Sequence, residues 1–297
     1  MTRVLTLIAA AAGGLGADAI GAARSALSRA GADAGESRWL ADGQALDLFF
    51  SNIEPERAEA AARDALVGAR IDLAAQAAAG RRKALLVADM ESTIIAEELL
   101  DELGRLAGLG ERIAAITERA MRGEIDFVEA LRTRVGWLAG MPASLLEEVR
   151  GRITLTPGAR ALVQTMRRHG AGTLLVTGGF DCFAESVAKA CGFDEIRANH
   201  LVVEDGRLAG RVREPVLEKG AKLAALRDAA TRLNLPLSAA AAVGDGANDL
   251  PMIEAAGLGV AFRGKPAVAA AARFRLDHSD LTGLLYLQGY RKEDFRT

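Results

Sequence analysis

The chain has few of the residues that usually carry redox, zinc or histidine chemistry. Two cysteines, three histidines and 4% aromatic residues occur in a length of 297. Cys182 and Cys191 belong to no C-x-x-C or Cys/His pattern, so we interpret both as small core residues rather than zinc ligands. None of the three histidines has a histidine or cysteine neighbour at ligand spacing. The sequence therefore gives no support to a histidine-based mechanism.

An excess of positive charge and a long apolar run are also missing. Lys and Arg number 37 against 39 Asp and Glu, which gives a formal net charge of -2. Such a chain lacks the broad positive field that attracts nucleic acid or an anionic membrane. No apolar run approaches the roughly 20 residues that span a bilayer. We expect a cytoplasmic protein without a nucleic-acid or membrane partner, which must bind any anion locally.

What the sequence does have is a 50% hydrophobic share, enough for a sizeable core and two domains. Its opening apolar residues end in Gly13 and Gly14, so they fit a strand better than a secretory leader. The elements expected next to it are a helix ending at Gly31, a hairpin over 39–50, a helix from Pro55 to about Gly68 and a strand near Ile71. This is the order of a ferredoxin-like split βαβ sandwich.

The element order of residues 1–80 resembles an ACT-like regulatory domain. Because such domains often bind amino acids, a serine-sensing role and a purely structural or dimerising role both stay open. The cluster of Gly13, Gly14 and Gly16 does not fit a G-x-G-x-x-G fingerprint, and we interpret it as an ordinary turn.

Acidic residues follow a buried strand after residue 83. Residues 84–88 form a continuous apolar run, typical of a strand buried on both faces. The run leads directly into D-M-E-S-T, which places the carboxylates of Asp89 and Glu91 two residues apart. Ligands bind beyond the carboxyl ends of strands in open α/β sheets, so we expect chemistry at these two residues.

Two more expected strands end in groups that suit an anion and a cation. The strand over 172–176 stops at Thr177-Gly178-Gly179, where a hydroxyl and backbone N–H groups can approach an anion. Residues 239–243 lead into G-D-G-A-N-D over 244–249, and crowded carboxylates repel unless a cation lies among them. A hard ion such as Mg²⁺ fits oxygen ligands. A plain Gly-Gly turn and a solvated acidic turn are the alternatives.

Together with Lys222, which opens an amphipathic helix between them, these segments resemble motifs I to IV of the haloacid dehalogenase superfamily. The likeness runs from about residue 83 almost to the C-terminus. The sequence around the four motifs resembles phosphoserine phosphatases of the SerB type. The stretches that carry the wider likeness are 118–134, 177–181, the hairpin 199–212 and 243–249. The resemblance implies an α/β domain over 81–297 with a Rossmann-like parallel sheet. A small helical cap, at about 97–153, would be inserted after its first strand.

The family's chemistry would use the residues named above. Phosphomonoester hydrolysis needs a nucleophile, a proton donor and positive charge. Asp89 would form an aspartyl phosphate and Glu91 would act as general acid and base, turning O-phospho-L-serine into L-serine, the last step of serine synthesis. The expected Mg²⁺ ligands are Asp89, the Glu91 carbonyl, Asp245 and, through water, Asp249. The expected phosphate-binding residues are Thr177, Gly178, Lys222 and Asn248, the last by positioning the site.

Substrate choice would depend on the cap. By resemblance, Glu98 receives the substrate ammonium and Arg134 grips its carboxylate in a two-pronged hydrogen bond. Met121 and Phe127 would line the pocket. For Glu98 and Arg134 the alternative is a solvated helix face.

Two positions depart from the usual family pattern. Glu91 stands where Asp is usual, so its carboxyl group is one methylene further from the backbone and must fold back to reach the leaving oxygen. Thr177 stands where Ser is commoner, with an equivalent hydroxyl. Two other functions stay open: action on another small phosphomonoester or phosphate acceptor, and a catalytically silent amino-acid sensor. The oligomeric state, including a homodimer, is open as well.

Overall fold

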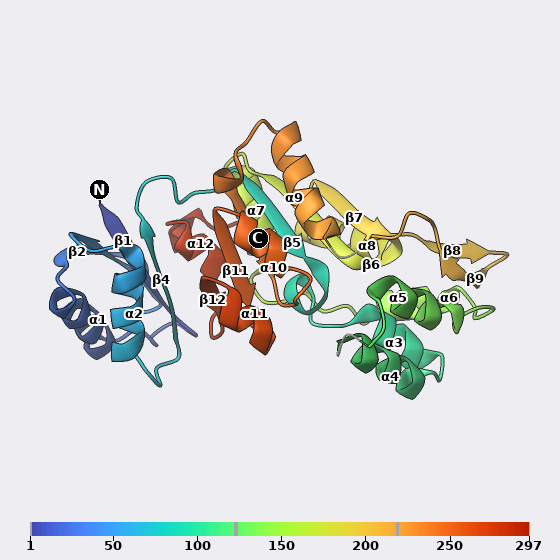
Figure 1. Cartoon of the computed structure of the whole chain (residues 1–297). Helices are drawn as coiled ribbons and strands as arrows, with labels where there is room; N and C mark the ends of the chain where they lie inside the picture. Colours follow the sequence, from blue (N-terminus) through green and yellow to red (C-terminus); the bar gives the residue numbers. More distant parts are fainter. Residues whose placement is uncertain (1, 122–123, 218–219, 297) are drawn as a thin grey trace.

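The computed structural model describes residues 2–121, 124–217 and 220–296. It confirms the expected fold class, with an antiparallel sheet at the N-terminus, a six-stranded parallel sheet and a helical insertion after the first parallel strand. Figure 1 shows the N-terminal sheet and the inserted helices at opposite ends of the molecule. Within the described residues, no helix has the length and apolar character needed to cross a membrane.

The N-terminal part has the predicted order of strands and helices. Its sheet is antiparallel in the order β2-β3-β1-β4, and one face packs on α1 and α2 through residues such as Leu5, Leu7 and Leu27. Strand β2 starts earlier than the expected hairpin. The bounds are β1 Arg3–Ala9, α1 Ala17–Arg29, β2 Asp33–Ala41, β3 Ala45–Ser51, α2 Pro55–Ala65 and β4 Ile71–Ala77.

The opposite face of this sheet packs on the rest of the chain. Asp47 on β3 is fully buried, accepts a hydrogen bond from the Thr6 hydroxyl at 2.8 Å, and pairs with Arg81. The Asp72 carboxylate on β4 accepts hydrogen bonds from the backbone N–H groups of residues 277–279. Buried polar groups therefore join the N-terminal sheet to the C-terminal segments.

The parallel sheet places β5 between β10 and β6. Its strand order is β12-β11-β10-β5-β6-β7, and every residue of β5 is buried, as the apolar run predicted. This order places β5, the first parallel strand in the sequence, near the middle of the sheet. The strands on its two sides, β10 and β6, are followed by different loops, and ligands of open α/β sheets bind at such a position. The bounds are β5 Leu85–Asp89, β6 Gly172–Phe180, β7 Glu195–Asn199, β10 Ala240–Gly244, β11 Leu258–Phe262 and β12 Phe274–Leu276.

Helices cover both faces of the parallel sheet. Leu86 and Ala88 of β5 belong to the core cluster that includes α7, α8 and α12, whereas Leu85 and Val87 belong to the cluster with α9, α10 and α11. The bounds are α7 Ala159–Arg168, α8 Asp181–Cys191, α9 Ala221–Arg232, α10 Leu250–Ala255, α11 Pro266–Ala271 and α12 Gly283–Leu287.

The prediction that the strand of β6 stops at Thr177 was wrong. Strand β6 continues to Phe180, which pairs with Asn199 of β7 after a register shift. The two glycines at 178 and 179 allow this irregular extension, because they lack the side chains that would hold a regular pleat.

Among the residues that the structure describes, the inserted segment forms four helices, and a hairpin from elsewhere in the chain packs on it. Leu99, Leu100 and Leu103 of this segment are buried. The hairpin is fastened to the insertion by hydrogen bonds such as Gly140 N–H to Leu208 O at 2.8 Å. The bounds are α3 Leu99–Leu106, α4 Gly110–Met121, α5 Phe127–Gly136, α6 Ser144–Arg150, β8 Leu201–Glu204 and β9 Arg207–Val212.

Candidate active site

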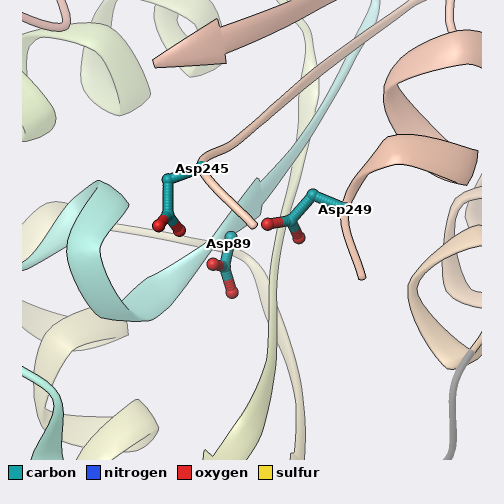
Figure 2. Close-up of side chains that lie close together, drawn as sticks. All are labelled: Asp89, Asp245 and Asp249. Carbon is teal, nitrogen blue, oxygen red and sulfur yellow. The ribbon is translucent and has the colours of Figure 1, made fainter. Parts of the chain in front are cut away.

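Three carboxylates meet at the carboxyl ends of two adjacent strands. Asp89 is the last residue of β5, and the β5–β10 register pairs Ala88 with Val243, two residues before Asp245. Figure 2 shows Asp89, Asp245 and Asp249 pointing toward one another. One oxygen of each lies within 4.8 Å of the others, and their exposures are 6%, 5% and 0%. Buried like charges this close need a cation among them.

The loop after β10 has a sequence that allows this crowding. A side chain at Gly244 would clash with the Asp249 carboxylate, so only glycine lets the loop fold back over the strand end. The N–H of Gly246 donates to Asp249 Oδ2 at 2.9 Å and fixes the carboxylate. The donor set consists of carboxylate oxygens, which suits a hard ion such as Mg²⁺.

Lys222 is buried within this acidic group. Its Nζ lies 2.5 Å from Asp89 Oδ1 and 2.5 Å from Asp249 Oδ1, and the residue is 6% exposed. Burial alone lowers the pKa of Lys222, but the two carboxylates outweigh it and raise the pKa above its ordinary value. Burial, and then the charge of Asp249, raise the pKa of Asp89, while Lys222 acts against them. A charged lysine therefore faces the expected nucleophile.

Glu91 lies between the strand end and the inserted helices. Its Oε1 accepts a hydrogen bond from Leu99 N–H at 2.8 Å, and its Oε2 accepts one from the Thr177 hydroxyl at 3.3 Å. Burial, followed by the negative charge of Glu98, raises the pKa of Glu91 to about 7, although the Leu99 N–H opposes the shift. Ser92 next to it has a left-handed backbone with φ of 55°, which turns the chain sharply after Glu91. A carboxyl group with this pKa can both give and take a proton near neutral pH.

Two charged residues from the inserted segment, Glu98 and Arg134, lie near Glu91. Glu98 Oε1 accepts a hydrogen bond from the Ser92 hydroxyl at 2.8 Å. Burial lowers the pKa of Arg134, and the charges of Asp101, Glu91 and Glu98 oppose this, so its guanidinium lies within electrostatic reach of the acids. Its Nη1 donates to the hydroxyl of Thr117 at 3.1 Å.

Phe127, at the start of α5, reaches the expected phosphate-binding segment. A side chain added at Gly178 would come 3.0 Å from the ring atom Cζ of Phe127, so the ring lies directly against the Gly178 backbone. The prediction for the Met121 side chain lies outside the described part of the chain, although its backbone ends α4. Asn248 is exposed, and its side-chain oxygen lies beside Gly246. The roles assigned to these residues stay predictions.

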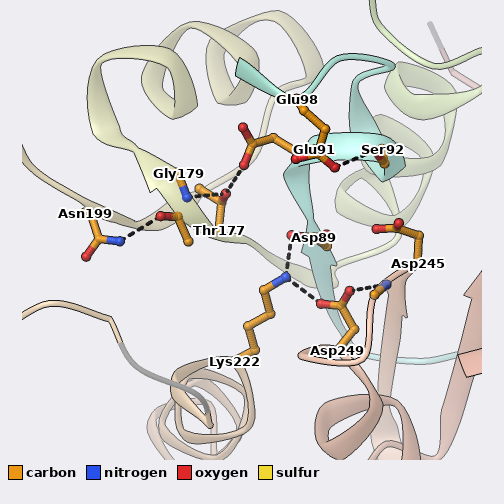
Figure 3. Close-up of polar contacts among 12 residues, drawn as sticks. Asp89, Glu91, Ser92, Glu98, Thr177, Gly179, Asn199, Lys222, Asp245 and Asp249 are labelled. Atoms are coloured by element: carbon orange, nitrogen blue, oxygen red, sulfur yellow. Dashed lines mark hydrogen bonds and ion pairs between the residues drawn. The ribbon is translucent and has the colours of Figure 1, made fainter. Parts of the chain in front are cut away.

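Sequence reasoning missed two polar residues near this site. Lys265, in the loop after β11, has its Nζ 3.2 Å from Asp245 Oδ2. The buried Asn199 donates from Nδ2 to the Gly178 carbonyl at 2.7 Å (Figure 3). Lys265 follows a parallel strand and Asn199 ends one, at the same edge of the sheet as the three carboxylates. The rule that ligands bind beyond the carboxyl ends of strands could therefore have pointed to both residues.

A Rossmann-like sheet with a helical insertion after its first strand and acids at the strand ends defines a haloacid dehalogenase-like hydrolase. The sequence model of the family described as haloacid dehalogenase-like hydrolase matches residues 86–254. A curated phosphoserine phosphatase from Streptococcus thermophilus is 47% identical over 199 residues, which are 67% of this chain and 93% of that protein. The chain therefore belongs to the phosphoserine phosphatase family of haloacid dehalogenase-like hydrolases.

Similarity also extends over the N-terminal part. A curated phosphoserine phosphatase from Streptomyces coelicolor is 40% identical over 252 residues, which are 84% of this chain but only 62% of that protein. The crystal structure of a HAD family hydrolase from Salmonella enterica serovar Typhi has a TM-score of 0.84 and 28% identity. That comparison covers 96% of this chain and 98% of the solved one.

Proposed function

We propose that this protein is a Mg²⁺-dependent phosphatase that hydrolyses O-phospho-L-serine to L-serine and phosphate through a covalent intermediate on Asp89. The observation that carries the proposal is the position of Asp89, buried between Lys222 and the two other carboxylates at a strand end. The choice of substrate is supported by two phosphoserine phosphatases that are 40% and 47% identical to this chain over the aligned residues.

In the first half-reaction, a carboxylate oxygen of Asp89 attacks phosphorus and the bond from phosphorus to the seryl oxygen breaks. The electron pair stays on the seryl oxygen, which takes the proton of Glu91. In the second, water attacks phosphorus, gives a proton to Glu91 and releases phosphate, which restores the Asp89 carboxylate. A pKa of Glu91 near 7 suits both directions of proton transfer.

Positive charge and N–H groups would stabilise the phosphoryl oxygens during transfer. Lys222 supplies a buried ammonium, the Thr177 hydroxyl and the Gly178 N–H supply hydrogen bonds, and Asn248 would help to position the loop. The Gly-Gly sequence lets the backbone come close to an anion.

The cation would be held by oxygen ligands of the acidic group. Asp89, the backbone carbonyl of Glu91 and Asp245 would bind Mg²⁺ directly, and Asp249, which already bonds Lys222, would act through water. When bound, the ion supplies positive charge that lets an anionic carboxylate approach an anionic ester.

The insertion would select the substrate. Glu98 would receive the ammonium group and Arg134 would grip the carboxylate. Both lie within electrostatic reach of Glu91, which would face the leaving oxygen, and this supports the assignment. Phe127 would close the pocket against Gly178, with Met121 as a further lining residue.

A panel of phosphomonoesters, assayed for phosphate release with and without Mg²⁺, tests this function. We expect O-phospho-L-serine to give the highest kcat/KM and EDTA to remove the activity. Preference for another ester, or transfer to an acceptor other than water, would favour a different phosphatase or phosphotransferase of this family. No turnover of any ester with Mg²⁺ present would favour the amino-acid sensor.

A further inference from the structure

Asn199 connects two segments of the expected phosphate site. It ends β7 and is 2% exposed. Its Nδ2 donates to the Gly178 carbonyl at 2.7 Å, and its Oδ1 accepts from Leu217 N–H at 2.8 Å. One side-chain amide therefore joins the phosphate-binding segment to the chain that leads into the helix of Lys222.

The bond to Gly178 fixes the direction of a peptide group. A carbonyl oxygen is the negative end of the peptide dipole and repels an anion, whereas the N–H groups attract one. Figure 3 shows Asn199 on the opposite side of Thr177 from Asp89 and Lys222. The Gly178 carbonyl is thus held away from the site where the phosphoryl group would lie.

The segment needs such a hold, because two consecutive glycines leave its backbone free to rotate. With the carbonyl fixed, the next N–H, that of Gly179, donates to Thr177 Oγ1 at 2.9 Å. The neighbour of Asn199 adds a second attachment, since Nδ1 of His200 lies 2.5 Å from Asp181 Oδ2 at the start of α8. This contact holds the end of β7 in place and so fixes the position of the Asn199 amide.

We propose that Asn199 is a positioning residue for phosphate binding, which keeps the Gly178 carbonyl out of the anion site and sets the Thr177–Gly179 segment against the Lys222 helix. The inference rests on the proposed phosphatase function. It adds that the affinity for phosphate depends on an amide that does not itself touch phosphate.

Two variants of Asn199 and one matched control test the role. Asn199→Asp keeps the acceptor for Leu217 but sets a carboxylate oxygen against the Gly178 carbonyl, and Asn199→Ala removes both bonds. Gln288→Glu makes the same amide-to-carboxylate change at a fully buried residue that bonds Lys83 N–H at 3.0 Å. Lys83 precedes β5 at the end opposite Asp89, so this control disturbs the core outside the site.

The measurement is calorimetric titration of each folded protein with inorganic phosphate in the presence of Mg²⁺. We expect the Kd to rise about 10-fold in Asn199→Ala and up to about 100-fold in Asn199→Asp, the range for a misplaced polar contact. For O-phospho-L-serine, kcat/KM should fall in the same order. Gln288→Glu should lower the Tm and leave the Kd unchanged.

The outcomes separate this proposal from the function on which it rests. Unchanged phosphate affinity in folded Asn199→Ala, or an equal loss in Gln288→Glu, would overturn the positioning role while the wild type still hydrolyses phosphoserine. A wild type that neither binds phosphate nor hydrolyses a phosphomonoester would overturn the phosphatase function itself. If Asn199→Asp does not fold, the phosphate affinities of Asn199→Ala and of the Gln288→Glu control decide whether Asn199 has the positioning role.

Discussion

Glu91 is one of the two positions expected to depart from the usual family pattern, and its hydrogen bonds show how its side chain is held. The carboxylate does not extend freely from the strand end, because one oxygen is bound to Leu99 N–H and the other to the Thr177 hydroxyl. The extra methylene is thus used to span from β5 to the start of α3. Burial keeps its pKa near neutrality, as a general acid requires.

The raised pKa of Glu91 predicts a pH dependence with a definite sign. The leaving oxygen needs the protonated carboxyl, so kcat/KM of the wild type should fall as the pH rises through about 7. Glu91→Gln should lower kcat by roughly 10² to 10⁴-fold and should lack this alkaline decline. Rates measured from pH 5.5 to 9 check both points. An unchanged decline in Glu91→Gln would assign it to another group.

Arg134 and Arg132 lie on the same helix and provide a matched pair. Arg134→Ala should weaken recognition of phosphoserine by about 2 to 5 kcal/mol, because a charged contact to the substrate carboxylate is lost. Arg132 is exposed and pairs with Glu214, so Arg132→Ala should leave kinetics unchanged. The measurement is the ratio of kcat/KM for O-phospho-L-serine to that for p-nitrophenyl phosphate. An Arg134→Ala ratio equal to that of the wild type would contradict the role.

At the scale of strands and helices, the local sequence pattern was enough to predict an element where neighbouring residues decide its structure. The apolar run before Asp89 predicted a doubly buried strand, which the structure confirms. The extension of β6 escaped prediction because it depends on pairing with Asn199. Sequence patterns near residue 72 likewise gave no sign of a partner some 200 residues away.

Asp72 provides the element-scale prediction. Its carboxylate, 4% exposed, accepts hydrogen bonds from Asp277 N–H and Ser279 N–H, each at 2.8 Å, and so attaches β4 to the chain after β12. Asp72→Ala leaves these N–H groups without their acceptor and should reduce the free energy of unfolding by about 3 kcal/mol.

The measurement for Asp72 is chemical denaturation, with the exposed Asp64 on α2 as the matched position. Asp64→Ala should change stability by no more than about 0.5 kcal/mol. Equal stability of Asp72→Ala and wild type would show that the contact between β4 and the C-terminal segment adds nothing to folding.

For the whole molecule, the fold brings chemistry from distant parts of the chain to one edge of the parallel sheet. Asp89, Thr177, Lys222 and Asp245 come from four segments. The ends of the expected strands pointed to Asp89, Thr177 and Asp245, whereas the place of Lys222, on a helix, could be predicted only because the order of motifs resembles a known family. The division into domains at about residue 80, the cytoplasmic location and a homodimer stay predictions.

Magnesium binding is a property of this assembled edge, and it predicts a thermal effect independent of turnover. An ion that binds the folded state alone raises the Tm, because it adds RT ln(1 + [ion]/Kd) to the free energy of unfolding. Mg²⁺ should therefore raise the Tm of the wild type and not that of Asp245→Asn, which loses one of the three converging carboxylates. A wild type with the same Tm in Mg²⁺ and in EDTA would contradict a cation site here.

The central claim is that Asp89 carries the phosphoryl group during turnover of phosphoserine. The most direct test is to mix the wild type with O-phospho-L-serine and Mg²⁺, quench with acid within one turnover, and measure the mass of the peptide that contains Asp89. We predict one added phosphoryl group on Asp89, and neither label nor turnover in Asp89→Asn. Turnover by Asp89→Asn at the wild-type rate, or a phosphoryl group on another residue, would contradict the account.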